Sequence, residues 1–589
     1  MIVAMKKIYL VVQKKDAISS LAALRELGVV HIEHEKTPSG DKITSLKEDA
    51  GALEKVAGTL KGYAVESPQE ELSGWRDKAK IVLDASENID ELREEIRKRH
   101  AHVSLLEPWG DFEPDDIKGL GAHGIYMGLY EIPVKNLKDI SEEVILRMIS
   151  KAGSIARCIA VSRREINLPF SQLPLPPFRL STLLTQQEDD QRKIKEQQRK
   201  IEELACYREG FHKVLEEIRL ELRFEEALNG MGEAQDLVYL KGFCPVDSCS
   251  RLQEAATREQ WALLVGEPSD DDKVPTLIRN PKWIELIKPL FAVINIIPGY
   301  KELDISLFFL LFFSVFFGML IGDAAYGLVF LLLTVFAHKK FKDRVKDSTP
   351  FFLMYLLSSC AIVWGLMTGT FLGTVLLGKT LKPVVSWLTE NKNVQFLCFL
   401  IGAIHLTIAH GWRFLMRMRS IFSALAEIGW IVILWGSFFL ANVMVIGTPL
   451  MGLDFSKSLR IVGVGAILVV IDIISRPKDN IMIGLVLSFF GCISAFTDLV
   501  SYIRLFAVGL AGVAVANAFN EMALNIGFSH VVVGFVTALI LVVGHLFNMI
   551  LGTMALFVHG LRLNVLEFSN HLGMEWSGVK YEPFQKAAV

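Results

Sequence analysis

Arg504 is the residue of this sequence with the clearest chemical consequence. It lies in Ser501-Tyr502-Ile503-Arg504-Leu505-Phe506, inside an apolar stretch over residues 481–522. A guanidinium stays charged at any pH that the chain meets, and a charge at the centre of a membrane costs at least about 2.5–3.5 kcal/mol. Such a residue indicates an ion path, a counter-charge or a buried pair. A structural arginine that extends to the membrane interface is the alternative.

Polar residues accompany Arg504 along two apolar segments. In the last segment, positions 545, 548, 552, 555, 559 and 562 alternate spacings of three and four, which predicts one helical face. The polar members of that face are His545, Asn548, His559 and Arg562. In the preceding segment Ser494, Thr497 and Ser501 share a face with Arg504, beyond which the face is apolar. A polar lining that stops at a fixed cation is typical of a half-channel ending at a barrier, although hydrogen bonds between helices explain the hydroxyls equally well.

Acidic residues near Arg504 are candidates for the two access routes. Asp498 is assigned to the inner route and Glu521 to the outer one. Six residues at about 100° each place Asp498 about 120° around the helix from Arg504, so we expect no direct pair between them. Weaker candidates in neighbouring segments are Asp472, Glu427 and His405, and Asp323 is expected to cap a helix or form a turn.

Composition divides the chain into two halves. Of its 589 residues, 51% are hydrophobic and 22% are charged, with the charges concentrated before residue 303. This pattern predicts a soluble domain over 1–302 and a membrane domain over 303–589. The net charge of −3 and the lack of a basic stripe argue against nucleic-acid binding. The seven cysteines match no zinc pattern, so no metal, cofactor or disulfide framework is predicted. Without a cleavable signal peptide, the N-terminal half is expected to be cytoplasmic.

The first half is expected to form an α/β dumbbell. Strand–helix–strand patterns at 6–33 and 236–265 predict a proximal lobe over about 1–45 and 232–302. Heptad patterns over about 46–105 and 180–231 predict an antiparallel coiled-coil shaft of about 65 Å. Strands at 121–133 and 154–161 with a proline-rich segment at 168–178 predict a distal lobe over about 106–179. The alternative is a compact domain. No phosphate loop or nucleophile motif indicates catalysis.

The second half is expected to be an α-helical polytopic membrane domain with eight spans. Apolar segments occur near 305–320, 324–337, 351–376, 394–411, 423–447, 458–475, 481–523 and 530–567. With the N-terminus inside, the inner loops carry ten Lys and Arg residues and the outer loops five, which is the favoured direction. Eight spans also return the C-terminus to the cytoplasm. The last two spans are about twice the length needed to cross, so they must tilt or protrude.

Several motifs carry a resemblance to a known family. They are Pro298-Gly299-Tyr300-Lys301-Glu302-Leu303-Asp304, Phe316-Phe317-Gly318, Gly322-Asp323-Ala324-Ala325-Tyr326-Gly327, Ser501-Tyr502-Ile503-Arg504-Leu505 and His559-Gly560-Leu561-Arg562-Leu563, the last followed by Glu567-Phe568. In these motifs the chain resembles subunit I, also called subunit a, of the rotary V-type and A-type ATPases and ATP synthases. The resemblance covers nearly the whole chain, and the two arginine motifs are its specific part.

The resemblance implies a role without catalysis of its own. The chain would be a stator subunit in the cell membrane, facing a rotating ring of c-type subunits and bound to peripheral stalks and other soluble subunits. Arg504 would be the essential arginine, supported by Arg562 and His559, and a ring carboxylate would exchange its ion there. Gly512 and Gly552 stand where some relatives carry polar or acidic groups, so neither is assigned to the ion path.

Two other functions are compatible with an intramembrane arginine. The first is a secondary transporter that binds an anionic substrate through Arg504 and the histidines, although the sequence shows no inverted repeat or paired broken helices. The second is a membrane tether that transports nothing, and the polar stripe argues against it.

Overall fold

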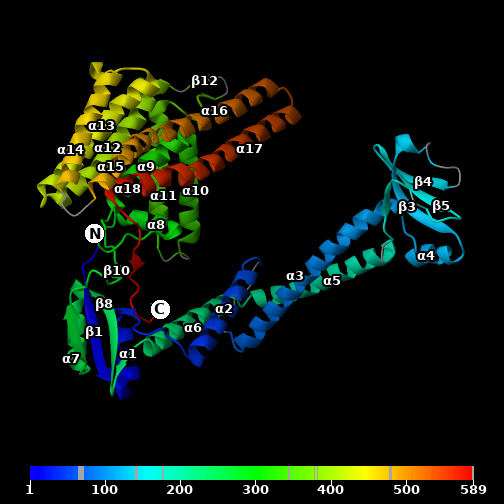
Figure 1. Ribbon diagram of the computed structural model, residues 1–589, viewed down its shortest axis with the longest axis horizontal. Helices are drawn as coiled ribbons and strands as arrows, with labels where there is room; N and C mark the ends of the chain where they lie inside the picture. Colours follow the sequence, from blue (N-terminus) through cyan, green and yellow to red (C-terminus); the bar gives the residue numbers. More distant parts are fainter. Residues whose placement is uncertain are drawn as a thin grey trace.

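The computed structural model describes residues 1–63, 72–137, 140, 144–166, 168–175, 178–342, 345, 347–376, 379–380, 382–475 and 480–586. It consists of a long arm and a helical bundle (Figure 1). The arm has a lobe at each end of a helical shaft, and the bundle sits above the proximal lobe, which contains the N-terminal strand. The predicted combination of an α/β dumbbell with a polytopic helical domain is therefore confirmed.

The proximal lobe is built from the two ends of the arm. Its sheet has the order β2 (His31–Glu33), β8 (Leu237–Pro245), β1 (Met5–Gln13) and β9 (Ala262–Gly266), all antiparallel, and the short β7 (Gly232–Ala234) also pairs with β8. Helices α1 (Ala17–Leu27) and α7 (Cys249–Arg258) contribute Leu21, Leu24 and Leu252 to the core, where they pack with alternate residues of β1. The sheet therefore joins segments more than 200 residues apart, as the two separate strand patterns predicted.

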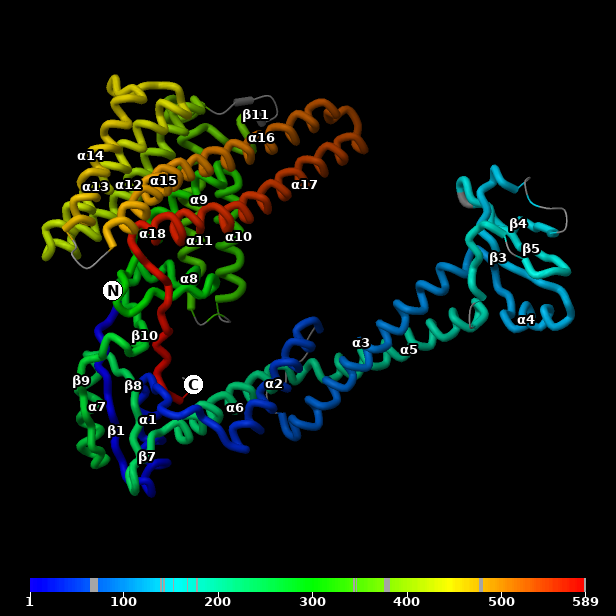
Figure 2. Tube along the Cα trace, in the orientation of Figure 1, coloured from blue at the N-terminus to red at the C-terminus, as the bar shows by residue number. Residues whose placement is uncertain are grey.

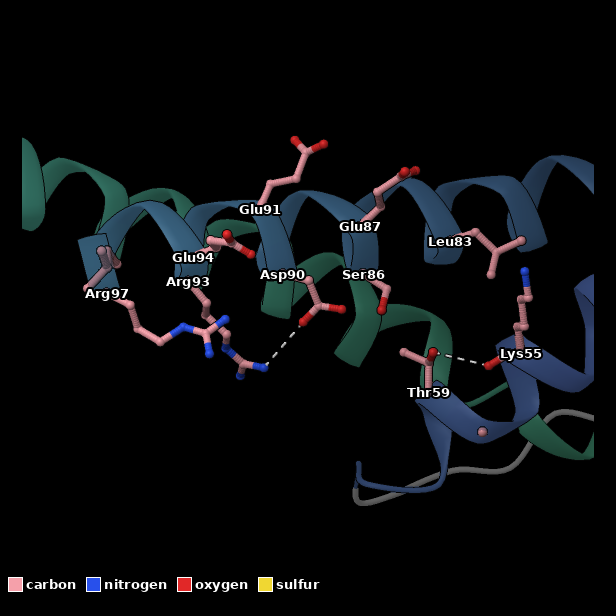
Figure 3. Close-up of a pocket in the computed structure, with 12 residues that line it drawn as sticks. Lys55, Thr59, Leu83, Ser86, Glu87, Asp90, Glu91, Arg93, Glu94 and Arg97 are labelled. Carbon is pink, nitrogen blue, oxygen red and sulfur yellow. Dashed lines mark hydrogen bonds and ion pairs between the residues drawn. The ribbon is translucent and has the colours of Figure 1, made fainter. Parts of the chain in front are cut away.

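The shaft contains two helices in each direction. The outgoing helices are α2 (Asp41–Leu60) and α3 (Trp75–Leu106), and the returning helices are α5 (Leu180–Ala205) and α6 (Arg208–Asn229). Helix α2 packs against α6, and α3 packs against α5. Apolar residues at the predicted spacing, such as Val82, Ile89 and Phe211, are buried between them. An open groove lies where the end of α2 meets the side of α3, and charged side chains including Glu87 and Asp90 line it (Figure 3).

The distal lobe differs in part from the prediction. Its antiparallel sheet has the order β4 (Ile145–Ala152), β5 (Ile155–Ser162), β3 (Tyr126–Pro133) and β6 (Ser171–Leu173). The strand expected from residue 121 begins only at Tyr126, because α4 (Pro114–Ala122) continues through that region. Both β4 and β6 were missed. The short β6 lies at the sheet edge inside the proline-rich segment, where proline is tolerated because an edge strand has no partner on one side.

The membrane domain is a bundle of apolar helices. They are α9 (Ser306–Ile321), α10 (Ala324–Phe341), α11 (Thr349–Thr368), α12 (Asn391–Arg417), α13 (Ile421–Ala441), α14 (Phe455–Ile474), α15 (Ile481–Val500), α16 (Ile503–Ile526) and α17 (Val531–Ala555), followed by the single turn α18 (Ser569–Leu572). Within the described residues six helical stretches are long and apolar enough to cross a membrane, with α15 and α16 counted together. The 16-residue α9 is shorter, and α14 carries three charged residues.

The number of spans is therefore not established by length and hydropathy, and eight remains a prediction. A helix or a consecutive pair of helices nevertheless lies at each of the eight expected segments. Four basic residues used to predict the orientation, Arg344, Lys346, Arg476 and Lys478, lie outside the described residues.

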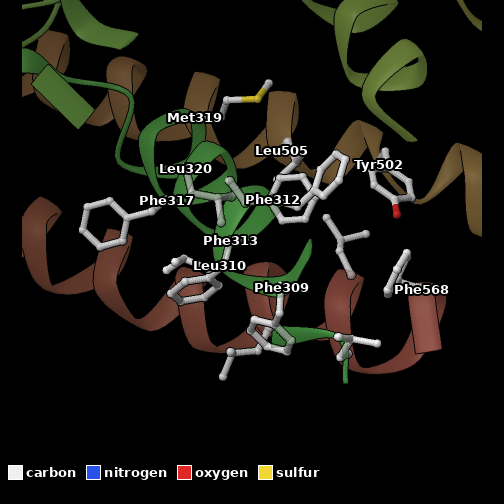
Figure 4. Packing of buried hydrophobic residues seen from close by; sticks show 14 of the residues in the cluster. Phe309, Leu310, Phe312, Phe313, Phe317, Met319, Leu320, Tyr502, Leu505 and Phe568 are labelled. Carbon is white, nitrogen blue, oxygen red and sulfur yellow. The ribbon is translucent and has the colours of Figure 1, made fainter. Parts of the chain in front are cut away.

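Helix α9 forms the centre of the bundle. Its residues Phe309, Phe313 and Phe316 are at most 1% exposed, and they belong to the same core as Tyr502 and Phe568 from the last two segments (Figure 4). Neighbouring helices bury most of the apolar surface of α9, and Leu307, Leu311 and Val315 form the exposed stripe that remains.

The last two segments form an antiparallel pair. Helices α15 and α16 meet at a turn over Ser501 and Tyr502, and α17 continues through the π-helical turns η9 (Leu556–Gly560) and η10 (Leu563–Phe568) into α18. Helices α16 and α17 extend together out of the bundle, across the direction of α12, α13 and α14 (Figure 1). This arrangement agrees with the expectation that the two long segments tilt or protrude, since α16 and α17 run at an angle to the other helices and beyond them.

The C-terminal segment returns to the arm. After α18 the chain runs down to the proximal lobe (Figure 2), where β13 (Val579–Lys580) pairs in parallel with β10 (Pro275–Thr276). The backbone N–H of Phe584 donates to the carbonyl of Val30 at 2.8 Å, and the Phe584 ring is buried in the lobe core. Residues before and after the membrane domain therefore lie on the same side of it.

Candidate ion-translocation site

Arg504 lies in the first turn of α16, where this helix leaves the bundle. Its Nε donates to the carbonyl of Ser501 at 2.9 Å, and its Nη2 pairs with Oε1 of Glu567 at 2.5 Å. The side chain is 22% exposed, whereas that of Glu567 is 3% exposed. The guanidinium is therefore held by groups of its own subunit, while part of the side chain remains accessible. As expected, Arg504 does not pair with Asp498.

Arg562 shares the same carboxylate. Its Nε donates to Oε1 of Glu567 at 3.2 Å, and its side chain is 52% exposed. In an α-helix, five residues at about 100° each would place positions 562 and 567 about 140° apart. Residues Leu563–Phe568 form a π-helical turn instead, and a π-helix brings residues i and i+5 together. The local change of helix type therefore makes this pair possible.

Aromatic packing holds in place the two helical segments that carry Arg504 and Glu567. The hydroxyl of Tyr502, two residues before Arg504, is 2.8 Å from Nδ1 of His405. The His405 ring stacks between Phe312 and Phe568, with ring centroids 3.8 Å and 4.2 Å away. Figure 4 shows Tyr502 and Phe568 converging on the α9 core. His405 is completely buried, so it positions the site and is not part of an aqueous path.

A second polar cluster lies farther along the pair, about 24 Å from Arg504 if sixteen residues rise 1.5 Å each. The hydroxyl of Tyr326 is 2.8 Å from Nδ1 of His545 and accepts from Nδ2 of Asn548 at 3.0 Å. The other His545 nitrogen is 3.1 Å from Oδ1 of Asn520. Asn520 in turn donates to the carbonyl of Leu372 at 2.6 Å, in the connection between α11 and α12.

The space between this cluster and Arg504 is mostly apolar. A cavity of about 150 Å³ is lined by small and aliphatic residues of α16 and α17, including Val508, Ala511 and Gly552, and only Tyr326 and Asn548 contribute polar side chains. The sequence predicted that the face beyond Arg504 becomes apolar, and Val508, Ala511 and Val515 line this cavity.

A third polar network lies on the other side of Arg504 and starts at Asp498. Oδ2 of Asp498 is 3.2 Å from Nε2 of His571, and Nδ1 of His571 is 2.9 Å from Nε2 of His410. Nδ1 of His410 is 2.7 Å from Glu427, whose other oxygen accepts from Arg417 at 2.7 Å. These contacts form a continuous chain from a partly exposed carboxylate to a buried one and then to an exposed guanidinium.

The structure separates several residues that the sequence placed together. His545 and Asn548 are buried, whereas Arg562 is exposed. The face expected over 545–562 holds as far as Ala555, since Asn548, Gly552 and Ala555 line one cavity. Beyond it the π-helical turn η9 interrupts the 3.6-residue period. The hydroxyls of Thr497 and Ser501 donate to backbone carbonyls of their own helix, so they do not form the hydrogen bonds between helices that were the alternative to a channel lining.

The remaining candidates have different surroundings. Glu521 is exposed on α16, Asp472 lies 3.3 Å from the hydroxyl of Ser423, and His559 is half-buried. The role of Glu567 was missed, although an acidic residue inside the apolar segment was itself a signal.

Asp323 caps α10, as the sequence predicted. Its Oδ1 accepts from the backbone N–H groups of Ala325 and Tyr326 at 2.8 Å and 3.3 Å, and also from Leu372 at 3.0 Å. Its Oδ2 accepts from Gly373 at 2.8 Å. The cap therefore fixes the backbone of Tyr326, whose hydroxyl contacts both His545 and Asn548 in the second polar cluster.

The fold and this site define a multi-pass membrane protein with a large α/β arm and a charged centre within its helical bundle. No known family model matches the chain. It is 31% identical over 621 residues to V-type ATP synthase subunit I of Borreliella burgdorferi, with all of both chains covered. It is 28% identical over 629 residues to V-type ATP synthase subunit I 1 of Treponema pallidum, again over both full lengths.

A solved structure, the cytoplasmic N-terminal domain of subunit I, homolog of subunit a, of V-ATPase, matches 44% of this chain and 99% of its own at 14% identity and a TM-score of 0.23. The sequence relationship over the full length is decisive: the chain belongs to the family of V-type and A-type ATP synthase subunit I. It is thus a non-catalytic membrane subunit of a rotary complex, as the resemblance implied.

Proposed function

We propose that this chain forms the ion path of the stator, with Arg504 as the group against which a ring carboxylate releases and reloads its ion. The observation that carries the proposal is the position of Arg504. Its guanidinium is fixed by Ser501 and Glu567, and its side chain is 22% exposed at the base of the protruding α16/α17 pair. A permanent cation there favours ionisation of a carboxylate that approaches from outside the subunit.

The two polar clusters support two separate access routes. Asp498 and His571 connect to Arg417 at the end of α12, which the charge pattern places on the inner side. His545 and Asn548 connect through Asn520 to the loop after α11, which the same pattern places on the outer side. We assign the first cluster to the inner half-channel and the second, together with exposed Glu521, to the outer one.

The outer surface of the α16/α17 pair suits a second set of apolar helices. Leu510, Phe547, Ile550 and Met554 are all exposed by more than 40%, and in the membrane such a surface faces either lipid or another helix. We assign a ring of c-type subunits to this surface. The rigid arm, with packed helices throughout its shaft, would bind the peripheral stalks and resist the torque of the ring.

The placement of both chain ends supports the proposed topology. Residues 579–586 pack on the lobe that also contains β1, so the chain crosses the membrane an even number of times. This agrees with eight spans in the cell membrane and with a cytoplasmic N-terminal domain and C-terminus.

The test is ATP-driven cation uptake by the purified complex in liposomes. Arg504→Ala should abolish uptake while the complex still assembles, because the cation that ionises the ring carboxylate is lost. The matched control is Arg460→Ala on α14, an exposed arginine that hydrogen-bonds only to its own helix among the described residues, and it should pump normally. Sustained uptake by the Arg504→Ala complex would refute the assignment.

A further inference from the structure

Glu567 lies at the centre of a charge arrangement that the proposed ion path leaves unexplained. One oxygen, Oε1, accepts from both Arg504 and Arg562. The other, Oε2, is buried and has no hydrogen-bond partner among the described residues. The Glu567 side chain is 3% exposed, while the side chains of Arg504 and Arg562 are 22% and 52% exposed. The negative charge is thus at the bottom of the cluster and the positive charges face outward.

The three side chains together carry one surplus positive charge. Two guanidiniums contribute +2 and the carboxylate contributes −1, since arginine does not deprotonate in proteins. Asp498, the other nearby carboxylate, is bonded to His571 and does not join this cluster. The site therefore lacks one negative charge for neutrality, which is the charge of a single ring carboxylate.

We propose that Glu567 is a positioning residue and resident counter-charge, which limits the strength with which Arg504 and Arg562 hold a passing carboxylate. This inference rests on the proposed function of Arg504. A site with a charge of +1 attracts an ionised ring carboxylate and becomes neutral when it arrives, so the carboxylate is stabilised without being trapped. Glu567 also keeps the two guanidiniums from repelling each other, because both donate to the same oxygen.

The proposal predicts opposite effects of the two neutralising substitutions. Glu567→Gln leaves a charge of +2, which favours the ionised ring carboxylate over its cation-loaded form. More cation is then needed to reload the ring. Arg562→Gln leaves a charge of zero, which favours the loaded form, so less cation is needed and release is slow. The double variant Glu567→Gln/Arg562→Gln restores +1. Other titratable groups in the electrostatic surroundings are His559, Tyr502 and Asp498, and all are unchanged in these variants.

The experiment measures ATP-driven cation uptake per assembled complex while the cation concentration on the loading side is varied. The cation is H⁺ or Na⁺, whichever the unmodified complex transports. We expect the cation concentration that gives half-maximal uptake to rise about tenfold in Glu567→Gln and to fall about tenfold in Arg562→Gln. One unit charge close to the ring carboxylate shifts its pKa by roughly one unit or more. The double variant should lie within about threefold of the unmodified complex.

The outcomes separate this inference from others. Shifts in the same direction, no shift, or a double variant farther from the unmodified complex than Arg562→Gln would each overturn it. If Glu567→Gln fails to assemble, the comparison of Arg562→Gln with the double variant still decides, and failure of the double variant alone counts against the proposal. A purely structural role for Glu567 would lower the maximal rate without opposite shifts. Loss of pumping in Arg504→Ala alongside unshifted Glu567→Gln would preserve the proposed function and reject only this inference.

Discussion

Replacement of Asp323 by asparagine tests whether its carboxylate organises the outer polar cluster. The side chain is 2% exposed and accepts four backbone hydrogen bonds, from Ala325, Tyr326, Leu372 and Gly373. In Asp323→Asn the amide oxygen can replace Oδ1 and keep three of these bonds, but the amide N–H₂ then faces the N–H of Gly373. One hydrogen bond to a charged acceptor is lost, worth about 1.5–3 kcal/mol, and a buried donor is left unpaired.

The expected destabilisation is therefore about 2–4 kcal/mol, since loss of the charge also weakens the three remaining bonds. For a domain of this size we expect the Tm of the detergent-purified protein to fall by about 4–8 °C, measured by intrinsic fluorescence. The control is Asp454→Asn at the start of α14, an exposed cap that accepts from the backbone N–H of Lys457. It should lower the Tm by less than about 2 °C. Equal changes in the two variants, or an unchanged Tm for Asp323→Asn, would refute the reasoning.

Three further predictions concern other parts of the structure. Phe584→Ala should release the C-terminal segment, because it removes a buried ring worth about 3–5 kcal/mol. Limited proteolysis should then cleave within residues 573–586, and unchanged protection of this segment would contradict the prediction. Burial opposes the low pKa of Asp272, but the bond from Lys7 holds this pKa at about 2. The resulting stability is present above the unfolded pKa of about 3.9 and is lost as pH falls through the folded pKa. The Tm difference between Asp272→Asn and the unmodified chain should therefore be largest near pH 7 and shrink steadily as the pH is lowered below about 4. Gly365→Ala should lower the Tm by several degrees, because its Cβ would lie 2.1 Å from the backbone nitrogen of Ala324, whereas Gly463→Ala, with open space, should not.

Residue spacing alone was sufficient for features governed by local periodicity. The 3.6-residue period predicted that Asp498 and Arg504 do not pair, and the two residues have different partners, although a turn over Ser501 and Tyr502 also separates their helices. The position of Asp323 between two short apolar segments identified a cap, because helix starts need side-chain acceptors. The division between a charged half and an apolar half followed from composition, since a membrane excludes charges.

Only the tertiary structure decided which groups meet around Arg504. Glu567 lies 63 positions away and reaches it because the α16/α17 hairpin closes; no local pattern encodes such a contact. The Arg562–Glu567 pair and the division of the 545–562 stripe both depend on π-helical turns. An extra residue in a turn rotates every later side chain, and both π-helical turns pack against α9. The sequence by itself therefore determined that a fixed cation lies within the membrane domain, while the partners that set its net charge were decided by packing between distant segments.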